Sequence, residues 1–187
     1  MTLNDYIKVC KKWEGGLSKD KDDSASAYPC PTPYKGQTGW HTNKGITYGS
    51  WVSIFGKTND ARFFAMSDED WFTIFDKNYF SKVKGHEFKT LNIAAMVTAI
   101  AWGSGVVQGG KHLQRALNIM GAKLEVDGII GQKTLKAANT ADQRQLFNTL
   151  LEVREQFFRA IAKGKNAKFL NGWLNRLRDY KQQFQIK

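Results

Sequence analysis

The sequence predicts a mainly α-helical fold, built around a central buried helix and accompanied by a small lobe of irregular or β structure. Residues 93–102 are apolar almost all round, as in a helix that is buried on every side. Residues 141–162 and 167–184 repeat their apolar positions at helical spacing. Residues 17–43, in contrast, keep no helical period, over a length at which loops in compact domains are usually functional or disordered.

The first expected helix leads directly to Glu14. Its apolar stripe recurs at steps of four, three and three residues, and Thr2 with Asp5 suits the start of a helix. The stripe is formed by Leu3, Ile7, Cys10 and Trp13. Gly15 and Gly16 can end the helix in the left-handed conformation, which puts Glu14 in the last turn.

Glu14 is the first candidate for a catalytic acid. A carboxylate in the last turn faces the negative end of the helix dipole, and Trp13 beside it can keep water away. Both effects would raise the pKa of Glu14 toward the range that a general acid needs at neutral pH. A glutamate before two glycines is more often only an exposed helix-end residue. A catalytic role for Glu14 therefore needs support from other parts of the sequence.

The stretch after Glu14 begins acidic and ends aromatic. Asp20, Asp22 and Asp23 follow Glu14 closely enough to return a second carboxylate across a cleft. Hydrolysis of a glycosidic bond commonly uses such a pair, one protonated acid and one ionised group. Taken alone, this charge run is more typical of a solvated surface.

The next elements are short. Residues 45–49 suit an extended element or turn lining a cleft, and a short helix over 51–55 should end at Gly56. Another helix should begin at Ser67, with the acidic residues 68–70 capping it rather than acting in catalysis. Its aromatic face is expected to be core. That face comprises Trp71, Ile74, Phe75 and Tyr79.

The C-terminal half should consist of helices separated by glycine-containing breaks. Residues 103–105 should end the central helix, although their glycines could instead approach a bound sugar closely. A new helix should start at Gln108 or Gly109 and end at Gly121. Asp127-Gly128 predicts a turn, and Gly131 leads into a further helix. The two long helices, joined at residues 163–166, should then pack antiparallel and close the domain.

Composition narrows the class of partner. The 187 residues carry 28 Lys and Arg against 17 Asp and Glu, an excess that favours polyanions such as nucleic acid, anionic membrane or bacterial cell wall. The basic residues are dispersed without a nucleic-acid-binding motif, so we expect no nucleic acid partner. We also expect no stable membrane insertion, because no stretch of 18 apolar residues occurs.

Neither the cysteines nor the histidines predict a metal site. Cys10 lies on an apolar stripe, so a buried thiol is its default state, and a Cys10–Cys30 bridge in an oxidising compartment is the alternative. The three histidines are far apart in the sequence and form no zinc motif. We therefore expect no metal and no other cofactor.

Three segments carry a resemblance to a known family. Trp13-Glu14-Gly15-Gly16, the Asp-containing loop and Thr42-Asn43-Lys44-Gly45-Ile46-Thr47 together resemble the signature of the glycoside hydrolase family 108 muramidases, phage-type endolysins of the lysozyme superfamily. Residues 113–117 with 126–135 are similar to the predicted peptidoglycan-binding region that accompanies this family, and residues 168–176 to its C-terminal helix. Two features depart from the family pattern. The connection through residues 28–34 is longer, and Trp102 stands where many relatives have Asn.

The resemblance implies a lysozyme-like fold and a reaction. Residues 1–90 would form a catalytic lobe and 91–187 a helical lobe with the peptidoglycan-binding-like segment, within one compact domain overall. Glu14 would protonate the leaving oxygen of the β-1,4 bond between N-acetylmuramic acid and N-acetylglucosamine. Thr47 would hold the attacking water. One of Asp20, Asp22 and Asp23 would stabilise the oxocarbenium-like transition state or orient the water together with Thr47. The residues expected to contact sugar are Tyr28, Tyr34, Trp40, Tyr48 and Trp102.

Two alternatives use the same sequence features. A lytic transglycosylase would cut the same bond with Glu14, and a non-catalytic wall-binding or secretion-accessory protein would not cut it. The expected partner is the peptidoglycan glycan strand, and the protein is expected to be a monomer.

The N-terminus lacks the pattern of a secretory signal, so we expect synthesis in the bacterial cytoplasm and action in the periplasm or cell wall after holin-type release or lysis.

Overall fold

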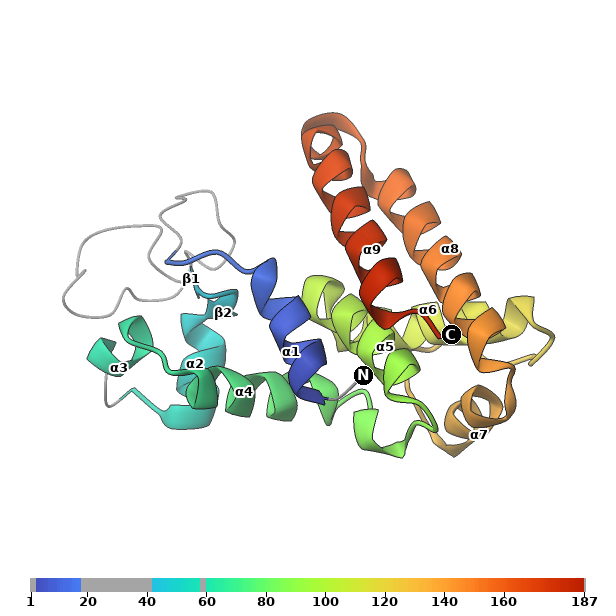
Figure 1. The fold of residues 1–187 in the computed structure, drawn as a ribbon, viewed down its shortest axis with the longest axis horizontal. Coiled ribbons are helices and arrows are strands. Elements are labelled where there is room, and N and C mark those ends of the chain that lie inside the picture. The colour runs from blue at the N-terminus through green and yellow to red at the C-terminus, as the bar shows by residue number, and fades with distance from the viewer. Residues whose placement is uncertain (1–2, 18–41, 58–59, 187) are drawn as a thin grey trace. The chain divides into compact units, whose positions relative to one another are not determined.

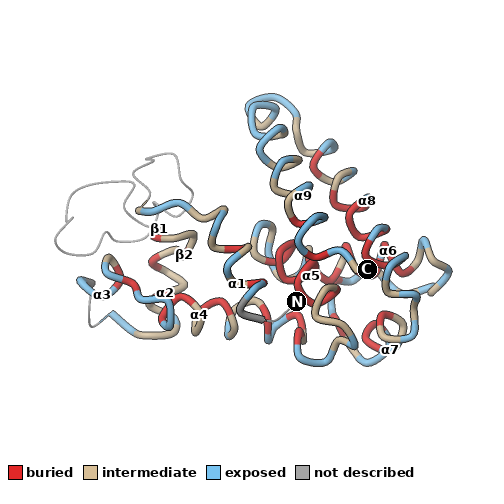
Figure 2. The backbone as a smooth tube through the Cα atoms, in the orientation of Figure 1, coloured by how far each residue is buried: buried red, intermediate tan, exposed pale blue. Residues whose placement is uncertain are grey.

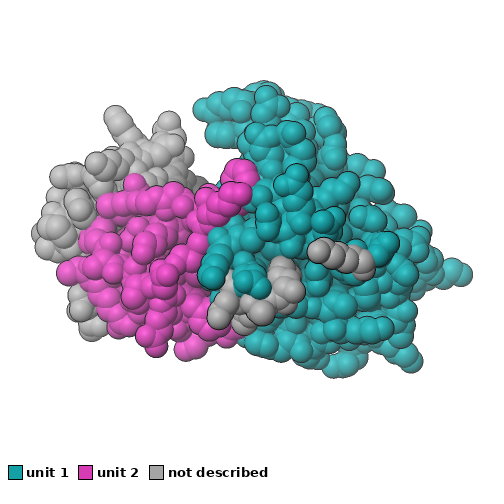
Figure 3. Space-filling view, in the orientation of Figure 1, with its two compact units in different colours: residues 1–9, 79–187 teal, residues 10–78 magenta. Residues whose placement is uncertain are grey.

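The computed structural model describes residues 3–17, 42–57 and 60–186, and it confirms the mainly α class with a small β element (Figure 1). The chain divides into two compact units, which Figure 3 colours separately. We call Cys10–Asn78 the small unit, and Met1–Val9 with Tyr79–Lys187 the large unit. Both changes of unit fall inside helical segments, α1 (Leu3–Lys12) and the π-helix η2 (Asp76–Phe80).

The small unit combines a two-stranded hairpin with short helices. Its remaining elements are β1 (Thr42–Asn43), β2 (Ile46–Thr47), α2 (Tyr48–Phe55), α3 (Asp60–Phe64) and α4 (Asp68–Phe75). The strands pair antiparallel, with Thr42 opposite Thr47 and Asn43 opposite Ile46. The two connecting residues, Lys44 and Gly45, both have positive φ, as a type I′ hairpin turn requires. The extended element predicted around residue 46 is thus confirmed.

Helix α2 begins earlier than the sequence suggested. It starts at Tyr48 rather than at residue 51, because Thr47 accepts a hydrogen bond from the Ser50 amide and caps the helix. It ends before Gly56, as expected. Helix α3 was not anticipated at all.

Helix α4 confirms the predicted cap. Ser67 accepts from the Asp70 amide, and the Asp70 carboxylate accepts in return from the Ser67 amide. Asp70 is buried, which on its own would raise its pKa, but hydrogen bonds from Arg62 and Ser67 lower the pKa of this carboxyl below its usual value. The predicted aromatic face is core where it belongs to α4: Trp71, Ile74 and Phe75 are fully buried.

The large unit is organised around α5 (Leu91–Ser104). Every residue from Ile93 to Ala101 is buried, which confirms the predicted central helix and is visible along α5 in Figure 2. The elements around it are η3 (Gly85–Glu87), α6 (Val106–Ile119), α7 (Gln132–Thr140), α8 (Gln143–Ile161), η4 (Gly164–Phe169) and α9 (Leu170–Phe184). Tyr6 of α1 is buried in this unit and lies against Phe80 and Phe184.

The predicted break at residues 103–105 was placed too early. Helix α5 continues through Gly103 and Ser104, and Gly105 alone separates it from α6, which starts at Val106 rather than at Gln108 or Gly109. One internal glycine costs a helix only about 1 kcal/mol, far less than α5 gains from burial. The close approach to a sugar considered for these glycines remains an expectation.

Helix α6 and the segment after it are joined by a close backbone contact. A Cβ on Gly110 would lie 2.0 Å from the Gly128 carbonyl oxygen, so only glycine fits there. The predicted Asp127-Gly128 turn is held by Gln114, whose side-chain oxygen accepts from the Gly128 amide. From Ala122 to Ile130 the residues alternate between more and less exposed positions.

Helices α8 and α9 lie side by side and run in opposite directions (Figure 1), which confirms the predicted closing pair. Helix α9 starts at Leu170, three residues later than expected, because residues 164–169 form the tighter η4. Among the described residues, every helix is too short or too polar to cross a membrane.

We predict that Gly110→Ala lowers the free energy of unfolding by about 1–3 kcal/mol or more, because the new methyl group meets the backbone of Gly128. Urea unfolding of the purified protein measures this. Gly172→Ala in α9 is the matched control, since its Cβ meets nothing within 4 Å, and it should be neutral or stabilising by up to about 1 kcal/mol. Equal effects of the two changes would contradict the contact.

We also predict a pH-dependent stability from His112 of α6. Burial lowers the pKa of His112 from 6.5 to about 4, with contributions from Arg154 and Arg115 and partly opposed by a hydrogen bond to the Gln108 carbonyl. The unfolded chain therefore binds a proton between pH 6.5 and pH 4 that the folded chain does not bind. Stability should fall by about 3 kcal/mol as the pH falls through this window.

Chemical unfolding at a series of pH values measures this dependence. His112→Leu should remove most of the slope between pH 6.5 and pH 4, whereas His86→Gln, at an exposed histidine, should keep it. An unchanged slope in His112→Leu would assign the pH dependence to other groups.

Candidate functional site

Glu14 lies just beyond the end of α1, not in its last turn. The helix ends at Lys12, and the amides of Trp13 and Glu14 donate to the carbonyls of Cys10 and Lys11 in a tightened final turn. Gly15 and Gly16 do not take the expected left-handed conformation. The Glu14 side chain is half-buried.

The chain is anchored in front of Glu14 by Lys11. Its amine forms an ion pair with Asp68, at the start of α4, and lies 5.8 Å from the centre of the Trp71 ring. The same hydrogen bond lowers the pKa of Asp68 below its usual value. Cys10, one residue earlier, is buried, as its place on the apolar stripe predicted. The end of α1 is thus attached to α4.

The chain is also anchored behind Glu14, by the hairpin turn. The Lys44 amide donates to the Gly16 carbonyl at 3.3 Å, and Leu17 forms an isolated antiparallel bridge with Asn43. Glu14 therefore sits on a short segment whose two ends are both attached to the small unit. This contact places the backbone after Glu14 next to the hairpin turn that leads into Ile46 and Thr47.

Lys44 is the residue that fixes the turn, and its role was not anticipated. Its carbonyl accepts from the Trp71 indole at 2.9 Å, and its amine donates to the Met66 carbonyl at 2.7 Å. The neighbouring Asn43 is buried, and its side-chain amide donates to the carbonyls of Phe63 and Phe64. A lysine before a glycine in a hairpin, where Asn or Asp is usual, was the available sequence signal.

Thr47 is half-buried, and its hydroxyl is used by the fold. Its oxygen accepts from the Ser50 amide at 3.1 Å and donates to the Ser50 hydroxyl at 2.9 Å. This structural use differs from the water binding that the family resemblance implies for Thr47. A hydroxyl oxygen keeps a second acceptor position, so capping leaves it able to bind a water molecule.

The expected sugar-contacting residues are distributed unevenly. Tyr48 is only 7% exposed and packs edge to face on Phe63, which argues against sugar stacking and makes it a core residue. Trp102 belongs to the large unit, where it is half-buried and lies against Tyr79 at 4.7 Å between ring centres. The other expected site residues lie outside the described part of the chain: Asp20, Asp22, Asp23, Tyr28, Tyr34 and Trp40. Cys30, and with it the possible Cys10–Cys30 bridge, lies outside it too.

Residues 3–17, 42–57 and 60–186 contain no cluster of three or more histidine, cysteine or carboxylate side chains able to hold a metal ion. Glu14 is a half-buried carboxylic acid on the segment that the hairpin turn contacts. A carboxylic acid in such a place can serve as a proton donor.

Comparison with known families identifies two segments. Residues 7–105 match the family described as Glycosyl hydrolase 108, and residues 108–178 match the family described as Predicted Peptidoglycan domain. The first match spans Glu14, Thr47, Tyr48 and Trp102. The order of the two segments is the order expected from the sequence.

Comparison with solved structures gives a match over nearly the whole chain. The structure titled "Structure of Brucella abortus SagA" aligns with a TM-score of 0.71 at 24% sequence identity, covering 97% of this chain and 95% of that chain. This likeness shows a shared fold. No curated protein matched.

Proposed function

The chain belongs to the glycosyl hydrolase 108 family, and from that premise we propose that Glu14 is its catalytic acid. The protein is a glycoside hydrolase that acts on peptidoglycan, cleaving the β-1,4 bond between N-acetylmuramic acid and N-acetylglucosamine. Glu14 would donate a proton to the leaving oxygen of that bond. The observation that carries this role is the attachment of the Glu14 segment on both sides, at Lys11 and at Gly16, which limits the positions that the carboxyl group can take.

Thr47 would orient the attacking water in this proposal. It lies at the end of β2, and the hairpin is bonded to the backbone two residues after Glu14. Its capping contacts fix the rotation of the hydroxyl, which favours a defined position for the water. One of Asp20, Asp22 and Asp23 would supply the second carboxylate, which stabilises positive charge on the sugar or activates the water.

The two family segments suggest a division of labour. We assign catalysis to residues 1–90 and binding of the wall to residues 91–187. The net charge of +11 favours the approach of a monomer to an anionic wall. Peptidoglycan as substrate places the action in the periplasm or cell wall, and we propose a phage or prophage endolysin that is released through a holin or by lysis.

We predict that Glu14→Gln lowers the release of reducing ends from purified peptidoglycan by roughly 10²- to 10⁴-fold, because the amide cannot donate the proton that the leaving group needs. The thermal unfolding midpoint should stay close to that of the parent protein. Glu69→Gln is the matched control: it makes the same change at an exposed position in the same unit and should keep full activity.

Mass spectrometry of the products completes this test. Hydrolysis gives reducing ends, whereas anhydro ends would assign the enzyme to the lytic transglycosylases. Full activity in Glu14→Gln would remove Glu14 from the mechanism.

We predict that Thr47 contributes to activity separately from its contribution to stability. Thr47→Asn keeps a side-chain oxygen that can cap α2, so its free energy of unfolding should change by only a few tenths of a kcal/mol, while Thr47→Ala should lose about 1 kcal/mol. Both variants lack the hydroxyl and should lose about tenfold or more in activity. Thr47→Ser should keep both properties, and an active Thr47→Asn would reduce Thr47 to a cap.

A further inference from the structure

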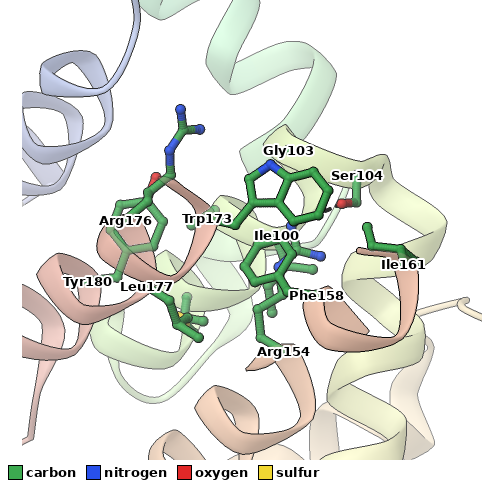
Figure 4. Close-up of a pocket in the computed structure, with 12 residues that line it drawn as sticks. Ile100, Gly103, Ser104, Arg154, Phe158, Ile161, Trp173, Arg176, Leu177 and Tyr180 are labelled. Atoms are coloured by element: carbon green, nitrogen blue, oxygen red, sulfur yellow. Dashed lines mark hydrogen bonds between the residues drawn. The ribbon is translucent and has the colours of Figure 1, made fainter. Parts of the chain in front are cut away.

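The large unit contains a cavity of about 140 Å³ between α5, α8 and α9 (Figure 4). A cavity of about 150 Å³ is large enough to hold benzene, so a group of that size fits. The apolar part of the lining comes mainly from Met96, Ala99, Ile100, Phe158, Ile161 and Leu177. The cavity draws residues from both family segments, because Met96 to Ser104 belong to the first match and Arg154 to Leu177 to the second.

Arg154 is the unusual member of this lining. It is only 4% exposed, and its guanidinium carbon lies 4.1 Å from the centre of the Phe158 ring. One terminal nitrogen donates to the Ser104 hydroxyl at 2.9 Å, and the other has no hydrogen-bond partner. Within the described residues, no carboxylate pairs with this side chain.

A buried arginine normally has an anionic partner, because removing a charge from water is costly without one. Burial lowers the pKa of Arg154 only to about 10, partly opposed by Tyr180 and with a smaller contribution from nearby Arg176, so Arg154 stays protonated at neutral pH. Arg176 lines the same cavity and adds a second positive charge. The position therefore offers a fixed cation with one unused donor.

The guanidinium of Arg154 lines the cavity next to Gly103. Gly103 has no side chain over Arg154, and a Cβ at this position would lie 3.4 Å from the terminal nitrogen that donates to Ser104. Gly103 is exposed, and Trp173 and Arg176 are half-buried. These residues place part of the lining at the surface of the large unit.

The combination of a cation with an apolar lining selects the chemistry of the ligand. A free phosphate would lose hydration on all sides and gain few contacts with the apolar walls. A carboxylate attached to a small alkyl group would match both parts of the site, because the carboxylate accepts a charge-assisted hydrogen bond from the guanidinium while the alkyl group contacts the apolar walls. The terminal D-alanine of a peptidoglycan peptide stem has this chemistry.

We propose that this cavity binds the terminal carboxylate of a peptidoglycan peptide stem, with Arg154 as its charge partner. The proposal rests on the assignment of peptidoglycan as the substrate and adds the peptide to the glycan as a recognised part. It explains why a charged residue occupies an apolar position of α8. The peptide stem would be held by the large unit independently of Glu14.

The test compares two probes that differ only in charge, N-acetyl-D-alanyl-D-alanine and its C-terminal amide. Isothermal titration calorimetry on the full chain should show the acid binding about tenfold or more tightly than the amide, because a charge-assisted hydrogen bond is lost in the amide. Inorganic phosphate should bind more weakly than the acid. Equal binding of acid and amide, or tighter binding of phosphate, would overturn the proposal.

Variants locate the effect. Arg154→Met should abolish the preference for the acid, and Arg154→Lys, which keeps the charge but loses the planar fork, should reduce it even if the methionine variant is unstable. Arg144→Met removes an exposed arginine from the same helix and should bind like the parent protein. A preference that survives in both Arg154 variants would exclude this cavity.

Glu14→Gln separates this proposal from the catalytic one. It should bind the acid with unchanged affinity, since the proposed contact is with Arg154 and needs no proton from Glu14. Loss of glycan cleavage with intact dipeptide binding in Glu14→Gln would concern Glu14 alone. Intact glycan cleavage with a lost preference for the acid in Arg154→Lys would concern the cavity alone.

Discussion

The small unit depends on the way Lys44 is held. This residue takes a left-handed backbone conformation that costs a non-glycine residue about 1 kcal/mol or more. Three hydrogen bonds stabilise it, from its amide to Gly16, from its amine to Met66 and from the Trp71 indole to its carbonyl. These bonds join the segment after Glu14, the hairpin and α4, three parts of the chain that are distant in sequence.

Much of the helical framework was predictable because it follows from the spacing of apolar residues. The central helix, the Ser67–Asp70 cap and the antiparallel pair α8 and α9 all have local signals, and all are confirmed. The boundaries were less predictable, since they depend on contacts between distant segments. The end of α1 shows this: glycines that could have capped the helix instead lead the chain to Lys44.

The candidate site could be predicted only in part for the same reason. The family signature in the sequence indicates Glu14 and Thr47 as site residues. Nothing in the sequence around Thr47 indicates that its hydroxyl is already hydrogen-bonded to Ser50. Arg154 was not predicted, because the more regular apolar stripe of this helix runs through Leu146, Leu150, Val153 and Phe157. A second stripe, Phe147, Leu151, Arg154 and Phe158, is buried as well, and an arginine where the period calls for an apolar side chain was the available signal.

The alternating segment from Ala122 to Ile130 has a consequence for how this protein can vary. Lys123, Glu125, Asp127 and Ile129 are the exposed members of the alternation. Of these four, Asp127 accepts hydrogen bonds from the Gln114 side chain and the Ile129 amide, so its side chain helps to form the turn. The outward side chains of Lys123, Glu125 and Ile129 can therefore diverge between related proteins, altering surface chemistry while the interior stays the same.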